Sequence, residues 1–140
     1  MQFHFEETRW LLRFEKGEDL LETLTRFLDE HGIESGSVAA IGAIDSVILG
    51  YYDPVERTYI RNNFPDSHEL LSLNGNITML ENKPFAHLHA VIGDRESRVR
   101  GGHLFAARVA VTVEMVIENW NTIVRRLPDK ETGLNLWSLD

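Results

Sequence analysis

The chain has 140 residues, of which 43% are hydrophobic and none is cysteine. A chain of this length builds one domain around its own core. The missing cysteines exclude disulfide frameworks, thiolate zinc fingers, iron–sulfur clusters and cysteine nucleophiles. Fourteen basic against twenty-two acidic side chains give a net charge of −8, which disfavours binding to phosphate backbones. No apolar run approaches the roughly 20 residues of a membrane span, and no signal-peptide pattern opens the chain. We therefore expect a soluble, cytoplasmic protein without a membrane partner.

The first predicted elements are a strand and a helix. Apolar residues alternate over 10–14, which predicts a strand that ends at Lys16-Gly17. Residues 19–31 carry leucines and a phenylalanine at helical spacing, behind the acidic pair Glu18-Asp19. Acidic residues favour the start of a helix, and Gly32 is suited to the position after its end. These features predict an amphipathic helix over 19–31.

The middle of the chain has a β pattern. Residues 37–52 are small and apolar, which predicts a strand closely approached by another backbone. Two more strands are predicted over 59–63 and 69–77. Asn74-Gly75 also fits a hairpin turn, but the apolar alternation continues across Gly75. We therefore expect the strand to pass through this glycine.

The last β block contains three predicted strands, over 85–92, 99–104 and 107–117, with a tight corner near Phe105. Apolar residues in the tail over 119–128 fit one or two helical turns. One main helix with six or seven strands predicts a single α+β domain over residues 1–140. Its sheet is expected to be mainly antiparallel and curled.

Three histidines form the candidate metal site. His87 and His89 are two residues apart in a predicted strand, so both side chains point to the same face, about 6.6 Å apart at the backbone. An antiparallel pairing brings His103 to the same end, and Gly101-Gly102 would let the backbone bend or bulge to aim it. Three imidazoles with an open fourth position are typical of catalytic zinc sites, although another divalent metal is an alternative. Coordination needs neutral imidazole, so affinity is expected to fall as the pH drops through about 6.5.

The alternative for these histidines is a surface or hydrogen-bonding role, and we expect no metal-binding role for His4 and His68. Glu114 lies inside an apolar segment. It either faces solvent or acts at a polar site, orienting a histidine or serving as a general base.

A local basic cluster provides candidates for anion binding. Arg98, Arg100 and Arg108 are the residues that we single out for this role. As a surface for DNA the cluster is small against the net charge of −8.

Motifs along most of the chain match one known family, in the same order. They are Gly17-Glu18-Asp19-Leu20, Gly42-Ala43, Leu49-Gly50-Tyr51-Tyr52-Asp53, Glu69-Leu70-Leu71-Ser72-Leu73-Asn74-Gly75-Asn76-Ile77, Lys83-Pro84-Phe85-Ala86-His87-Leu88-His89, Gly101-Gly102-His103-Leu104 and Thr112-Val113-Glu114. The chain resembles the PPC domain, also called DUF296, the plants and prokaryotes conserved domain. The core of the resemblance covers about residues 9–118.

The resemblance implies an α+β sheet fold and a homotrimer with the histidines near a subunit boundary. The family is described as predicted DNA-binding because its plant members carry AT-hooks, and this chain has no Arg-Gly-Arg-Pro segment. The family's fold is similar to that of acetolactate decarboxylase, whose zinc is held by an H-x-H pair and a later histidine. Carried onto this sequence, the similarity implies His87, His89 and His103 as zinc ligands. It does not carry the decarboxylase activity, because function belongs to a site and not to a fold.

Three functional interpretations follow. The first is a homotrimeric PPC protein with a three-histidine zinc site and a DNA-binding or regulatory role. The second is a zinc-dependent lyase or hydrolase that acts on a small oxygenated anion, with Glu114 moving protons and an arginine holding a carboxylate. The third is an assembly module in which the histidine site only stabilises the trimer. A fourth, exchangeable water on the metal would separate the second interpretation from the third.

Overall fold

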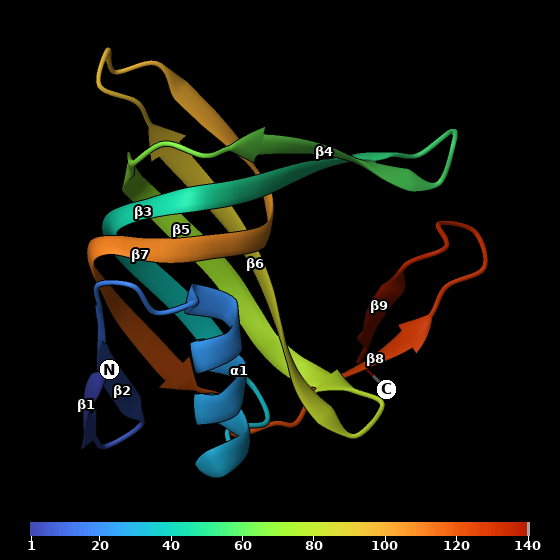
Figure 1. The fold of residues 1–140 in the computed structure, drawn as a ribbon. Helices are drawn as coiled ribbons and strands as arrows, with labels where there is room; N and C mark the ends of the chain where they lie inside the picture. The colour runs from blue at the N-terminus through green and yellow to red at the C-terminus, as the bar shows by residue number, and fades with distance from the viewer. Residues whose placement is uncertain (140) are drawn as a thin grey trace.

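The computed structural model describes residues 1–139, which form one helix, α1, and nine strands joined in one sheet (Figure 1). The helix spans Leu20–Glu30. The strands are β1 (Gln2–Glu6), β2 (Arg9–Glu15), β3 (Gly36–Asp53), β4 (Thr58–Phe64), β5 (His68–Leu80), β6 (Lys83–Gly93), β7 (Val99–Asn119), β8 (Arg125–Pro128) and β9 (Asn135–Ser138). The fold is broadly α+β, as predicted, but strands dominate it.

The helix forms where the sequence predicts it. Asp19 caps its N-terminus, since the carboxylate accepts a hydrogen bond from the backbone N–H of Glu22 at 2.9 Å. Gly32 follows the helix with a φ of +63°, a conformation that glycine adopts without strain. The buried face of α1 includes Leu24 and Phe27. Within the described residues, no helix is long and apolar enough to cross a membrane.

Four strands pair in a closed cycle. β3 pairs antiparallel with β5 and β7, and β6 pairs antiparallel with the same two strands. The sheet therefore curls around a core that includes Ile44, Leu73, Leu88 and Val109, each at most 1% exposed. The helix packs against this core, in front of the curled sheet in Figure 1. β8 joins β5 in parallel, so the sheet is mixed.

One strand prediction needs correction. The segments 99–104 and 107–117 are one continuous strand, β7, rather than two strands separated by a tight corner. The irregularity near Phe105 lies within the strand, where the register against β3 shifts between Asp45 and Leu49. The strand predicted to pass through Gly75 does so, as part of β5.

The two ends of the described chain form strands that the sequence analysis missed. β1 pairs with β2, and the tail forms the β8–β9 hairpin rather than helical turns, which raises the strand count above the six or seven expected. Buried Val124 and Arg126 alternate with exposed neighbours, a period typical of a strand. The strand was missed because Arg126 is charged, and a charged residue is rarely found on a buried face.

Candidate metal centre

One hairpin supplies all three candidate histidines. His89 and His103 are direct cross-strand partners on β6 and β7, and His87 lies two residues from His89 on the same face of β6. One ring nitrogen from each of the three lies within 4.8 Å of those of the other two. The ring centroids are separated by 5.1 to 5.5 Å. The structure thus brings together the three histidines that the sequence analysis singled out.

The spacing is close to what a metal ion requires. Zinc bonds to imidazole nitrogens at roughly 2.0–2.1 Å, so a tetrahedral site holds its nitrogens about 3.4 Å apart. Small side-chain rotations of the three imidazoles cover the difference. The Nδ1 atom of His103 is buried and has no hydrogen-bond partner. Buried polar atoms are almost always paired, so this nitrogen fits a site that receives a further group.

Gly102 brings β7 close to β3 just before His103. A Cβ atom added at Gly102 would lie 2.7 Å from the carbonyl oxygen of Gly50. The β6–β7 ladder is regular through Ala90 and Gly102, so the bend or bulge expected at Gly101-Gly102 does not occur in this ladder. The glycine is needed for close packing of two backbones.

Burial keeps two of the imidazoles neutral. Desolvation lowers the pKa of His87 to about 4, helped by the positive charge of Arg126 and by His89. Desolvation also lowers the pKa of His103 to about 4, helped by His87 and His89. Neutral imidazole is the form that coordinates metal. Competition from protons at these two residues therefore begins at lower pH than the value near 6.5 expected from the sequence.

A buried arginine from β8 contacts the histidine site. The Nε of Arg126 donates to the Oγ1 of Thr78, its Nη1 to the carbonyl oxygen of Asn135, and its Nη2 to the Oδ1 of Asn76, each at 2.8 Å. The same Nη2 atom lies 3.2 Å from the Nδ1 of His87. Asn76 is the cross-strand partner of His87. The guanidinium is thus fixed beside the histidine by contacts with β5 and β9.

A cavity of about 350 Å³ opens beside the imidazoles. Its lining includes His87, His103, Arg126 and the aromatic rings of Tyr59, Phe85 and Phe105. The ring of Tyr59 lies 5.1 Å from that of His103. Burial raises the pKa of the Tyr59 phenol, so the hydroxyl stays protonated at neutral pH.

The β8–β9 hairpin forms one wall of this cavity through Leu134, Asn135 and Leu136. Figure 1 shows the hairpin on the same side of the molecule as the far end of β4. The hydroxyl of Tyr52 donates to the carbonyl oxygen of Thr132, which ties the β3–β4 end to the β8–β9 turn.

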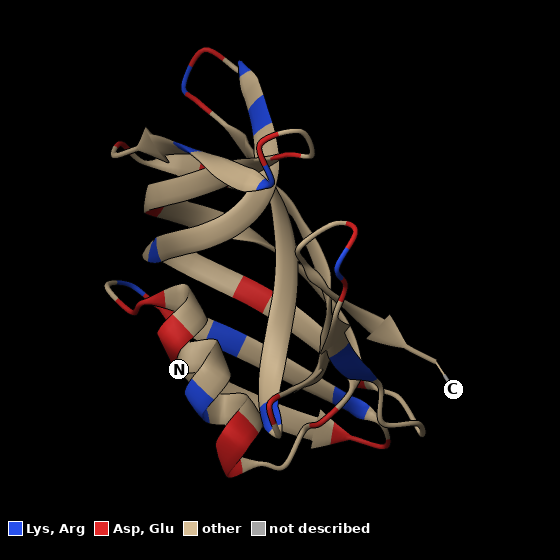
Figure 2. Cartoon of the chain, turned by 90° about the vertical axis from the view of Figure 1, so that its right-hand side faces the viewer, with Lys and Arg blue, Asp and Glu red and all other residues tan. Residues whose placement is uncertain are grey.

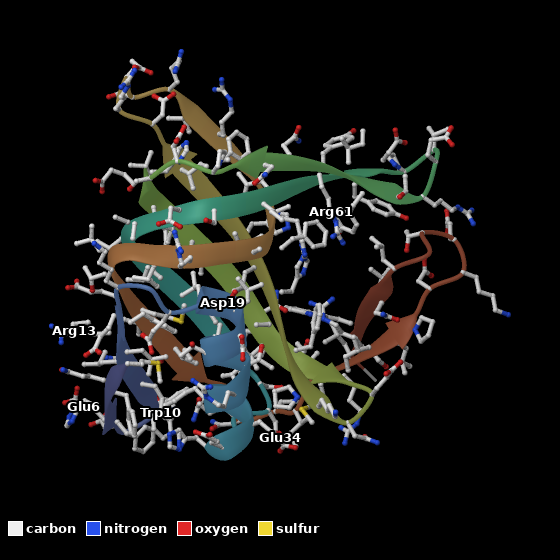
Figure 3. All side chains as sticks on the ribbon, viewed as in Figure 1. Glu6, Trp10, Arg13, Asp19, Glu34 and Arg61 are labelled. Carbon is white, nitrogen blue, oxygen red and sulfur yellow. The ribbon has the colours of Figure 1, made fainter. Side chains whose placement is uncertain are left out.

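A second guanidinium lies near the site. Arg61, labelled on β4 in Figure 3, has its guanidinium carbon 4.1 Å from the centroid of the Phe105 ring. That ring lies 4.5 Å from the ring of His103. The charge of Arg61 is one of the smaller causes that lower the pKa of His103.

The other predicted site residues lie away from the cavity. Glu114 is exposed opposite Ile41 and lines grooves on the outer face of the sheet. Arg98 is paired with Asp94 and Glu96, and Arg108 with Asp45. Arg100 donates to the carbonyl oxygen of Val99 and lines a separate cavity with Tyr51. The structure does not bring these four residues to the histidines.

The sequence analysis missed the residues that surround the trio. Tyr59, Asn76 and Phe105 carry no pattern of their own, because cross-strand pairing and packing place them. Arg126 had a usable signal, since it stands two positions after Val124 in an alternating segment. A strand interpretation of that segment would have placed the arginine on the buried face.

Comparisons with known proteins agree with this architecture. The structure is similar to a metal-containing protein from Archaeoglobus fulgidus, at 38% identity, 99% coverage of both chains and a TM-score of 0.87. It is similar to a plant- and prokaryote-conserved (PPC) protein from Pyrococcus horikoshii, at 32% identity, 98% and 94% coverage and a TM-score of 0.88. A protein from Bacteroides thetaiotaomicron, provisionally designated DNA-binding, matches at 26% identity, 98% and 96% coverage and a TM-score of 0.94.

One similar sequence belongs to a much longer protein. The bifunctional protein GlmU of Synechococcus sp. (strain JA-3-3Ab) is 29% identical over 125 residues, which cover 87% of this chain. The chain spans about a fifth of that protein, 19% of its length. The sequence profile of the Plants and Prokaryotes Conserved (PCC) domain, the family abbreviated PPC above, matches residues 1–121. The chain therefore belongs to the PCC domain family.

Proposed function

We propose that this PCC-domain protein binds one divalent metal ion per chain, zinc, through His87, His89 and His103. The observation that carries the proposal is the convergence of three imidazoles within 4.8 Å, with a buried and unpaired Nδ1 on His103. Three imidazoles without a thiolate suit zinc and leave its fourth position open. The similar protein from Archaeoglobus fulgidus is metal-containing, which supports the same role here.

A second candidate function is a zinc-dependent lyase or hydrolase that acts on a small oxygenated anion. The cavity beside the imidazoles favours it, because a ligand there would contact both His87 and Arg126. Bound zinc would act as a Lewis acid that polarises a carbonyl group, or it would activate a water molecule as a nucleophile. The phenol of Tyr59 would donate a proton or a hydrogen bond, and the apolar walls would exclude solvent. Glu114 takes no part within one chain, since it lines other grooves.

We assign the outer face of the sheet to a homotrimer. A groove of about 810 Å³ crosses this face, and its lining includes Leu11, Ile41, Glu114 and Val116. Ile41 is 59% exposed, Leu11 41% and Val116 40%, so exposed apolar side chains gather along this groove, as is typical of an interaction surface. Asn74 lines the groove and is the cross-strand partner of His89. Subunits that meet here would lie next to the histidine site, and the third interpretation, a metal that only stabilises the trimer, uses the same contact.

Charge argues against DNA as the main ligand, despite the provisional designation of the Bacteroides protein. The chain has fourteen basic and twenty-two acidic residues. Arg98 and Arg108 are already paired with carboxylates. Figure 2 shows basic and acidic residues interspersed along the chain rather than gathered on one element.

Elemental analysis of protein purified without an affinity tag tests the metal proposal. We expect about one zinc per chain, or one-per-chain binding when the metal-free protein is titrated. A protein that carries no metal and binds none would overturn the proposal. X-ray absorption of the zinc form separates the remaining roles. Three nitrogens with one exchangeable oxygen indicate an open position, whereas a closed set of protein ligands indicates a structural ion.

A further inference from the structure

We infer that metal and a small organic carboxylate bind cooperatively at the histidine site, and that Arg126 couples the two. The inference rests on the proposed metal site and concerns what else must bind there.

The site holds positive charge without a balancing carboxylate. No residue that lines the described cavity is acidic, whereas Arg126 lines it and Arg61 lies behind Phe105. The Nη2 of Arg126 lies 3.2 Å from the Nδ1 of His87. A divalent ion held by His87 would therefore lie close to a buried guanidinium. Repulsion at such a distance, away from bulk water, weakens metal binding by about tenfold or more.

Arg126 is not free to move away from the ion. Its contacts with Thr78, Asn76 and Asn135 fix it on neighbouring strands. Its Nε–H, one Nη1 hydrogen and one Nη2 hydrogen are used on Thr78, Asn135 and Asn76. A neutral imidazole has a single lone-pair nitrogen, so once His87 ligates a metal it has no acceptor left for Arg126. Two of the five N–H donors of the guanidinium are then free, and an anion that accepts from them and also reaches the metal would offset the repulsion.

The cavity indicates which anion this is. Its volume of about 350 Å³ is at the lower end of the range for small-molecule sites, roughly 300–1,000 Å³. Its walls include Phe85, Phe105, Leu134 and Leu136, all apolar. Inorganic oxyanions would leave these walls without a partner. A monocarboxylate with a short apolar body satisfies both the charged end and the walls.

Isothermal titration calorimetry with zinc tests the coupling in the wild-type protein, with butyrate as the carboxylate and butyramide as its uncharged counterpart. We expect saturating butyrate to tighten zinc binding about tenfold and butyramide to leave it unchanged. Zinc should tighten butyrate binding by the same factor, because coupling is reciprocal. These measurements do not depend on any variant folding correctly.

Two variants of β8 locate the coupling. Arg126→Met should tighten zinc binding in the absence of anion and abolish the effect of butyrate. Arg125→Met is the matched control. Arg125 is the exposed neighbour on the same strand, and its replacement removes the same charge outside the cavity. Arg125→Met should keep the full coupling.

Three outcomes would contradict the inference in different ways. Zinc binding that is equal with butyrate and butyramide would overturn the coupling and leave the metal site intact. Sulfate that couples more strongly than butyrate would overturn the assignment to an organic carboxylate. No zinc binding under any condition would overturn the proposed function as well.

Discussion

His89 and His103 are direct partners in the β6–β7 ladder, and their ring centroids lie 5.5 Å apart. Their distance depends on the register of this one hairpin. A slip of one residue would turn a histidine to the opposite face of the sheet.

Replacement of His87, His89 or His103 by alanine, one at a time, should abolish one-per-chain zinc binding. Each replacement removes one of only three nitrogen ligands, while the apolar core is untouched. Zinc titration and elemental analysis measure the loss, and circular dichroism checks the fold.

His4→Ala and His68→Ala are the controls for this series, because these residues lie on β1 and at the start of β5, outside the trio. Both should bind zinc like the wild type. The ligand assignment would be wrong if a control lost the metal or if a variant of the trio kept it.

The metal-free protein should lose stability as the pH falls from about 6.5 to about 4. The pKa values of His87 and His103 are about 4 in the folded chain and about 6.5 when unfolded. In this window the unfolded chain binds protons that the folded chain does not. The neutral imidazoles therefore contribute full stability above about 6.5, and the contribution is lost as the pH falls through about 4.

Urea unfolding of chelator-treated protein between pH 7 and pH 4 measures this effect. Carboxylates also gain protons in this range, so the double variant His87→Gln, His103→Gln is the reference. Its unfolding midpoint should depend less on pH than that of the wild type. Parallel curves for the two proteins would show that burial does not hold the histidines neutral.

Gly102→Ala should destabilise the protein by about 1–3 kcal/mol and weaken metal binding. The added Cβ would lie 2.7 Å from the carbonyl oxygen of Gly50, so β7 must shift next to His103. Gly101→Ala is the matched neighbour, where the nearest atom to a Cβ is the carbonyl oxygen of Ala90 at 3.3 Å. It should cost less in urea unfolding and in zinc affinity. Equal effects of the two variants would contradict the close-packing role of Gly102.

Light scattering should give three times the mass of one chain at micromolar concentration. Ile41→Asp should shift the protein toward monomer, because the carboxylate would enter the proposed contact face without a partner. Val55→Asp is the control, since Val55 is 84% exposed in the β3–β4 turn and does not line the groove. A wild-type protein that is a stable monomer would refute the assembly.

Binding to random duplex DNA should be weak, with a Kd at or above roughly 10⁻⁴–10⁻⁶ M at physiological salt. The net charge of −8 is multiplied in an oligomer, which repels the phosphate backbone. Fluorescence anisotropy over a range of salt concentrations measures the affinity. Sub-micromolar binding that weakens steeply with salt would contradict this prediction.

The sequence was most informative where the pattern is local. Helical spacing and the acidic pair Glu18-Asp19 identified α1, and the i, i+2 spacing of His87 and His89 identified the strand that carries them. The pairing with His103 followed from the short turn between two predicted strands. These features depend on neighbours along the chain, which the sequence displays directly.

The rest of the site depends on distant segments. Arg126 reaches His87 only because β8 pairs in parallel with β5, a connection that no local pattern indicates. Glu114 stood out in the sequence as a carboxylate in an apolar segment, but alternation along β7 places it on the exposed face. The long strand β7 was divided in the prediction because its bend comes from register shifts against β3.

The β6–β7 hairpin also bears on the order of events during folding. Hairpins form in about 1–10 μs, whereas pairing between distant segments is slower. The three imidazoles therefore meet early, while Arg126 arrives only when β8 docks on β5. An isolated hairpin is only marginally stable in water, so an ion captured at that stage would hold the β6–β7 register before the rest of the chain closes around it.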